Sequence, residues 1–213
     1  EQNREIIFEN LGVNNNIKFE EIKGFEKFDI AYFTILKEKS LETQKQVARI
    51  IKSLDSLLAI SMESHAIMQD YKMYEEFFRF ADFVFLDVDG INRSIESEME
   101  NIAKKITSKN ACTVILKIKR RLDCVKIYDK RNKTEIKNIF QKEGEYLYKG
   151  SAFDAGFIFG ILKKKSFEDC VKIGLILARE CGKETSFLDC LPNLSRLNSL
   201  LKELEMLEQD ENK

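Results

Sequence analysis

Apolar residues recur along the chain in two alternating periods, one typical of strands and one typical of helices. Short runs rich in β-branched and aromatic residues predict strands at residues 4–9, 29–36, 56–62, 83–86, 112–118 and 125–128. Between these runs, apolar residues recur every three or four positions, which is the period of an amphipathic helix. Helices are predicted at residues 18–24, 41–54, 71–80, 95–106, 158–162, 167–178 and 193–207. This alternation of strands and helices predicts an α/β fold with a parallel sheet and right-handed crossovers.

The 213 residues are expected to form a single domain, because no linker divides them. Hydrophobic residues make up 44% of the chain and charged residues 33%, which is enough apolar material to bury a core. The acidic end, from about residue 205, is expected to fray. The sequence shows neither an apolar run of the roughly 18 residues that a membrane span needs nor a signal peptide. We therefore expect an intracellular, cytoplasmic protein without membrane contact.

Glycine, cysteine and histidine counts limit the chemistry. The chain has only nine glycines, whereas phosphate-binding loops need glycine for close backbone approach to an anion. Its five cysteines show no CxxC spacing and its only histidine is His65, so the residues do not form the ligand pattern of a zinc site. The odd number of cysteines favours reduced thiols.

One segment resembles a known signature. Residues 150–162 read Gly-Ser-Ala-Phe-Asp-Ala-Gly-Phe-Ile-Phe-Gly-Ile-Leu. This is similar to the signature helix of the ribokinase-like (PfkB) carbohydrate kinases, Gly-Ala-Gly-Asp-Ala-Phe-x-Ala-Gly-Phe. The matching residues are Ala152, Phe153, Ala155, Gly156, Phe157, Gly160 and Leu162. The resemblance continues in order along nearly the whole chain, with residues 12–14 at the place of the family's Gly-Ala-Asn turn.

The resemblance implies a three-layer ribokinase-like fold, with a mainly parallel central sheet flanked by helices. The first third of a family member, which carries the sugar-binding residues and the lid, has no counterpart here. The expected fold is therefore incomplete at its N-terminal side, and the whole of residues 1–213 corresponds to the C-terminal two-thirds of the family fold.

The resemblance also implies a kinase site whose chemical residues have changed. The family's catalytic base is an Asp, but the aligned residue is Ser151, and a serine hydroxyl is not a useful general base near neutral pH. Lys149 and Gly150 align with the anion hole at the helix start, where they could hold an anion. The family's Asn-x-x-Glu motif helps to organise magnesium. It aligns with a segment that begins at Asp87, which could still favour a cation, and ends at Gly90 in place of the Glu.

Three interpretations of function follow. The first is a catalytically degenerate kinase homologue that needs no cofactor and acts as a structural or regulatory binding subunit of a larger protein assembly. The second is an active carbohydrate or nucleoside kinase that uses ATP and magnesium. Its base would be Asp154, which lies three residues after Ser151; the simpler role of Asp154 is to stabilise a first helical turn. The third is a sensor that binds a small molecule without catalysis.

A basic segment suggests a contact with a partner. Residues 117–133 hold eight basic residues against two acidic ones. Such a segment could neutralise phosphates of RNA, or it could be a solvated sheet edge kept charged to discourage strand pairing. The basic residues are Lys117, Lys119, Arg120, Arg121, Lys126, Lys130, Arg131 and Lys133.

Overall fold

The computed structural model describes residues 17–22, 27–35, 39–88, 93–118, 124–130, 133–137, 149–181 and 192–211. Its strands form one six-stranded sheet, in which each strand lies beside its neighbours in the sequence. The first four strands are parallel, and the last two add to them antiparallel. The strands are β1 (Ile30–Thr34), β2 (Leu57–Glu63), β3 (Phe83–Val88), β4 (Thr113–Ile118), β5 (Cys124–Tyr128) and β6 (Lys133–Lys137).

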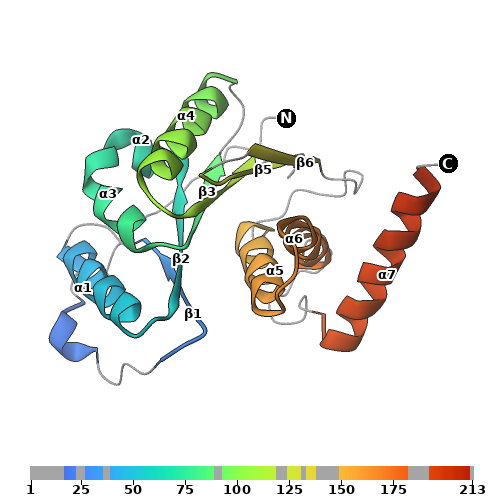
Figure 1. Ribbon diagram of the computed structural model, residues 1–213, viewed down its shortest axis with the longest axis horizontal. Helices are drawn as coiled ribbons and strands as arrows, with labels where there is room; N and C mark the ends of the chain where they lie inside the picture. Colours follow the sequence, from blue (N-terminus) through green and yellow to red (C-terminus); the bar gives the residue numbers. More distant parts are fainter. Residues whose placement is uncertain are drawn as a thin grey trace, which may run out of the picture.

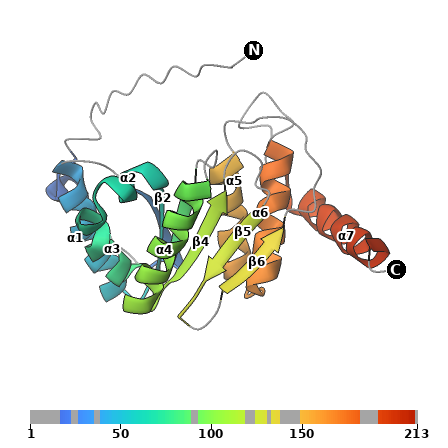
Figure 2. The same cartoon turned by 90° about the horizontal axis from the view of Figure 1, so that it is seen from above.

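Helices cover both faces of this sheet and complete three layers (Figure 1). One face carries α1 (Lys39–Ser53), α2 (Ser64–Gln69), α3 (Tyr71–Phe80) and α4 (Arg93–Lys109). The other face carries α5 (Lys149–Leu162) and α6 (Phe167–Cys181). The last helix, α7 (Leu194–Glu211), lies outside these layers, next to α6 (Figure 2). A short 3₁₀ helix, η2 (Phe19–Glu21), precedes β1.

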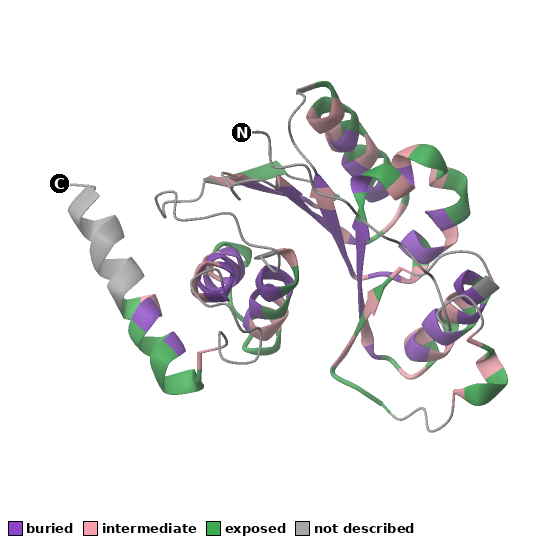
Figure 3. Ribbon diagram, turned by 180° about the vertical axis from the view of Figure 1, so that it is seen from behind, coloured by how far each residue is buried: buried purple, intermediate pink, exposed green. Residues whose placement is uncertain are grey.

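The sheet separates two apolar cores, so that its inner strands, β2 to β5, are largely buried (Figure 3). Under α1–α4, Leu58 and Ile60 of β2 join the same cluster as Phe77 of α3. Under α5 and α6, Phe157 lies edge-on to Phe85, with ring centroids 5.4 Å apart. Parallel strands need this two-sided cover, which explains why their sequences are near-continuous apolar runs.

The glycines of the signature-like segment allow α5 and α6 to touch. A Cβ atom added to Gly156 would lie 2.7 Å from the Cα of Gly174, closer than real Cβ contacts. One turn later, a Cβ on Gly160 would lie 2.7 Å from the Sγ of Cys170. The residues that carry the resemblance are therefore largely packing residues, which hold α5 against both the sheet and α6.

The expected fold class is confirmed, and the predicted elements are found wherever the structure describes them. Two elements were not predicted, β6 and the six-residue α2. The last helix continues to Glu211, past the expected end at residue 207 and through most of the segment expected to fray, because no Gly or Pro interrupts it. The predicted first strand, residues 4–9, lies outside the described residues. In the part of the chain that the structure describes, no helix has the length and apolar character needed to cross a bilayer.

Candidate functional site

The candidate site lies where the parallel strands end, below the start of α5. Asp87 near the end of β3 is the register partner of Lys117 near the end of β4. Each follows an apolar residue of the α5-side core by two positions, Asp87 after Phe85 and Lys117 after Ile115. Because side chains alternate along a strand, Asp87 and Lys117 share the face covered by α5.

Lys117 is fully buried, with 0% of its surface exposed. Its Nζ lies 2.5 Å from Oδ1 of Asp154 on α5 and 2.9 Å from Oδ1 of Asp87. It also donates to the carbonyl oxygen of Gly150 at 3.4 Å. A buried ammonium is costly unless it is paired and hydrogen-bonded, and these three oxygens meet that requirement.

Asp154 is the second buried charge, with 1% of its surface exposed. While Oδ1 faces Lys117, Oδ2 accepts a hydrogen bond of 2.9 Å from the hydroxyl of Tyr32 on β1. Burial raises the pKa of Asp154 above its ordinary value, and nearby Asp87 adds to this effect, while Lys117 opposes it. Burial and Asp154 likewise raise the pKa of Tyr32. We call Tyr32, Asp87, Lys117 and Asp154 the ion cluster.

The predicted anion site at the start of α5 faces this cluster. A Cβ on Gly150 would lie 3.4 Å from Oδ2 of Asp87, so the Asp87 carboxylate lies against the first turn of the helix. A carboxylate is favoured there by the helix dipole. Ser151 is exposed, whereas Asp154, one turn on, is buried. The side chain of Lys149 lies outside the described residues.

The expected cation site at Asp87 is occupied by a side chain of the protein itself. The cation that Asp87 contacts is the ammonium of Lys117, at 2.9 Å. Among the described residues, no group of three or more His, Cys, Asp or Glu side chains could hold a metal ion.

Two described lysines of the basic segment, Lys117 and Lys126, are buried rather than exposed. Lys117 is buried, so its predicted contact with phosphates or a partner surface is wrong. The same correction applies to Lys126, of which 7% is exposed and whose Nζ lies 2.5 Å from Glu96 and 2.6 Å from Glu100 of α4. Although burial lowers the pKa of Lys126, the hydrogen bonds that it donates to Glu100 and Glu96 raise this pKa overall.

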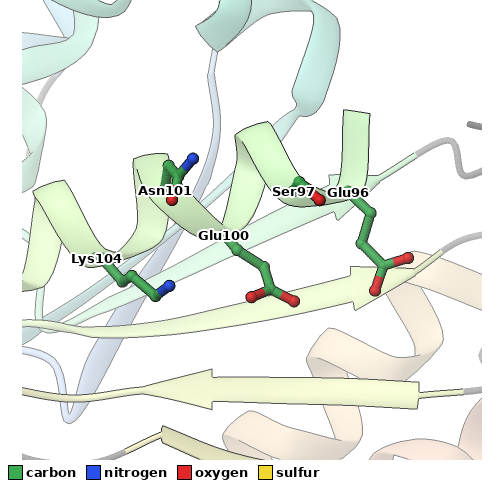
Figure 4. Close-up of a pocket in the computed structure, with 5 residues that line it drawn as sticks. All are labelled: Glu96, Ser97, Glu100, Asn101 and Lys104. Atoms are coloured by element: carbon green, nitrogen blue, oxygen red, sulfur yellow. The ribbon is translucent and has the colours of Figure 1, made fainter. Parts of the chain in front are cut away.

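The other basic residues divide into two groups. Lys130 is exposed, and Lys133 lies 3.5 Å from Glu100 and 3.8 Å from Glu135. The side chains outside the described residues are Lys119, Arg120, Arg121 and Arg131. The glutamates that pair with Lys126 belong to α4, as Figure 4 shows, and they line an open groove with Ser97, Asn101 and Lys104. This groove is acidic and lies away from the ion cluster.

The surroundings of His65 and of the described cysteines do not indicate a reactive site. His65 is half exposed at the start of α2, where its Nδ1 lies 3.1 Å from Glu63. Cys112, Cys170 and Cys181 are buried free thiols. Burial raises the pKa of Cys112 to about 12 and that of Cys170 to about 11, so neither is an activated nucleophile.

Solved structures with the same arrangement decide the fold. Ribokinase from Thermotoga maritima superposes with a TM-score of 0.61 and 18% identity, covering 82% of this chain and 57% of that enzyme. A nucleoside kinase from Methanocaldococcus jannaschii, described as an archaeal member of the ribokinase family, superposes with a TM-score of 0.67 and 18% identity. The match covers 87% of this chain and 60% of that kinase. The chain has the ribokinase-like fold.

A third ribokinase-like structure extends the comparison. Aminoimidazole riboside kinase from Salmonella enterica gives a TM-score of 0.65 and 13% identity, covering 87% of this chain and 66% of that one. The chain thus spans between half and two-thirds of the length of these ribokinase-like proteins. No protein-family model matches the sequence. No curated protein matches it either.

Proposed function

We propose that this chain is a catalytically degenerate protein of the ribokinase-like fold that serves as a structural or regulatory binding subunit of a larger assembly. One observation carries the proposal: the carboxylate of Asp154 is buried and held at both oxygens, by Lys117 and by Tyr32. A general base must come within hydrogen-bonding reach of the proton that it removes. Asp154 is turned inward and has partners already.

Ser151, the other candidate for the catalytic base, also lacks the properties of a base. Ser151 is exposed near the start of α5, where a substrate could reach it. Its hydroxyl has no carboxylate chemistry, and it would need an activating base of its own to accept a proton from a sugar. The resemblance thus aligns the family's base with a side chain that is accessible but chemically unsuitable.

The second candidate function is an active carbohydrate or nucleoside kinase with Asp154 as the displaced base. The raised pKa of Asp154 favours it, since perturbed carboxyl groups are common at functional sites. Its place supports it too, because α/β sheets bind ligands at the carboxyl ends of their strands. Catalysis would require Asp154 to leave Lys117 and Tyr32, at the cost of breaking one of the two ion pairs of a buried ammonium.

A second argument against an active kinase is that the magnesium ion it would need does not fit beside Asp87. A magnesium ion next to Oδ1 of Asp87 would meet the Lys117 ammonium, 2.9 Å from the same atom. Two cations so close repel each other strongly in a poorly solvated site. The described residues therefore do not fit a metal at Asp87, and we propose a protein that works without ATP and magnesium.

The partner that we propose is another protein, docked at the β1 side of the sheet. In the described part of the chain β1 pairs only with β2, and a strand edge of this kind is a template for further pairing. Phe28 and Tyr32 at this edge are 44% and 39% exposed. An RNA partner would be left with Lys130 and Lys133, together with basic residues outside the described ranges.

Nucleotide binding and turnover test the proposal. The longest natural form of the chain would be titrated with ATP and ADP in the presence of magnesium by calorimetry, and assayed for phosphate transfer to sugars and nucleosides. We expect neither binding nor turnover. Turnover that Asp154→Asn abolishes and Ser151→Ala leaves intact would establish the second candidate. Saturable nucleotide binding without turnover would instead establish a sensor.

A further inference from the structure

The Lys117 ammonium has the surroundings of a bound cation. Its oxygen neighbours come from separate elements: Asp87 from β3, and Asp154 and the Gly150 carbonyl from α5. Carboxylate and carbonyl oxygens are the donors that hard cations prefer in proteins. The ring faces of Phe85 and Phe153, with centroids 5.4 and 5.9 Å from Nζ, add the attraction of aromatic rings for a cation.

The charges of the cluster require a cation at this position. With both carboxyl groups ionised, Asp87 and Asp154 place two negative charges around the Lys117 ammonium, which contacts both of them. Asp154 is fully buried and the Asp87 side chain is only 13% exposed, so water cannot replace the ammonium as the main source of stabilisation. Without a positive charge, Asp154 in the second turn of α5 would be repelled by Asp87 at the end of β3.

We propose that Lys117 is a tethered cation, whose ammonium fills an oxygen-lined site for a monovalent cation and so joins β3, β4 and α5 without a bound ion. The lysine stem crosses the apolar core from β4, and its ammonium donates hydrogen bonds to Asp154 and to the Gly150 carbonyl while it forms an ion pair with Asp87. Because the cation is covalently attached, the junction does not depend on ligand or salt. This inference concerns how the site is closed and holds whether or not the chain is an enzyme.

The test is replacement of the tethered cation by a free one. In Lys117→Met, the flexible methionine keeps an apolar side chain in the core and must fold back from the position of Nζ for an ion to lie against the three oxygens. The thermal unfolding midpoint would be followed by circular dichroism at constant ionic strength, as tetramethylammonium chloride is exchanged for ammonium or potassium chloride. We expect the midpoint of the variant to rise saturably with ammonium and potassium, and that of the wild type to stay constant. At ten times its Kd, the ion would raise the folded-to-unfolded ratio about tenfold.

Two variants control the experiment. Lys126→Met removes another lysine held by two carboxylates, but those of Glu96 and Glu100 are 30% and 19% exposed and hydrated, so we expect no ion-specific rescue. In Lys117→Met/Asp154→Asn one buried carboxylate is also neutralised, and we expect a folded protein whose midpoint no longer responds to ammonium.

Specific outcomes would overturn the proposal. A midpoint of Lys117→Met that ignores ammonium and potassium would show that no cation site exists there, as would an equal response of the wild type. If the variant is unfolded in tetramethylammonium, refolding from urea into each salt replaces the midpoint as the readout. If Lys117→Met fails to refold in ammonium chloride while Lys117→Met/Asp154→Asn folds, the tethered-cation proposal is wrong. None of these results depends on nucleotide turnover, so this proposal and the proposed function fail separately.

Discussion

Replacing Lys117 by methionine should destabilise the protein in a way that depends on pH. The substitution keeps an apolar stem of similar length but leaves Asp87 and Asp154 without their shared ammonium. Removal of one partner from a buried ion pair typically costs about 3–5 kcal/mol. Asp154 is fully buried and loses its 2.5 Å contact, so we expect a loss in this range at pH 7.

The sign of the pH dependence follows from the raised pKa of Asp154. Without Lys117 the main opposing influence is gone, and that pKa must rise further. A carboxyl group whose pKa is higher in the folded than in the unfolded chain takes up its proton on folding, so stability increases as pH falls toward the unfolded pKa. The gain is about 1.36 kcal/mol per pH unit for one proton. Between pH 7 and pH 5 the variant should therefore recover stability relative to the wild type, by at most roughly 2.7 kcal/mol, because the raised pKa of Asp154 gives the wild type a part of the same gain.

Urea denaturation at pH 7, 6 and 5 measures this recovery. Far-UV circular dichroism is the suitable signal, since the chain has no tryptophan. Lys117→Met/Asp154→Asn is the control: with one carboxylate neutralised, most of the stability at pH 7 should return and the extra pH dependence should disappear. A loss below about 1 kcal/mol at pH 7, or a loss equal at all three pH values, would refute the electrostatic reasoning.

Three further predictions follow from contacts elsewhere in the molecule. Gly156→Ala should lower the unfolding free energy by about 1–3 kcal/mol, because its Cβ would meet Gly174 at 2.7 Å; thermal unfolding beside the exposed-site variant Ser151→Ala checks this. Burial raises the pKa of Glu100, but the hydrogen bond from Lys126 and its charge lower this pKa overall. Glu100→Gln should therefore lower the unfolding free energy by about 1 kcal/mol at neutral pH. In urea titrations, the difference from the wild type should disappear as pH falls through the pKa of Glu100. Cys170, with a pKa of about 11, should resist iodoacetamide at pH 8 until urea unfolds the chain, as peptide mass spectrometry would report; rapid native labelling would contradict its burial.

The sequence predicted the layers of the fold because the relevant signals are local. Apolar runs of four to eight residues and helical periods identify parallel strands and their helices directly. β6 was missed because its sequence, Lys-Thr-Glu-Ile-Lys, is an edge strand with a single large apolar residue. Such a strand exists through its pairing with β5 rather than through its own pattern.

The ion cluster was missed although part of its signal is in the sequence. Lys117 was counted with the neighbouring basic residues, but it follows Ile115 at the two-residue spacing of one strand face. That alternation places a lysine on a buried face, which demands an acidic partner. Asp87 occupies the matching place in β3, but the register that aligns the two residues is a property of the sheet. The hydrogen bond from Tyr32 to Asp154 joins residues 122 positions apart, so no local sequence pattern predicts it.

The sequential order of the strands has a consequence for how the chain folds. Each strand pairs with the one made just before it, so the sheet can grow from β1 to β6 as the chain leaves the ribosome, without waiting for distant segments. The face that will carry α5 and α6 nevertheless stays open to water until residue 181 has been made. During that interval Lys117 and Asp87 are hydrated, and the apolar residues around them are exposed. The docking of α5 therefore dehydrates the charges and the core in a single late step, which makes this sheet face the natural target of chaperones during synthesis.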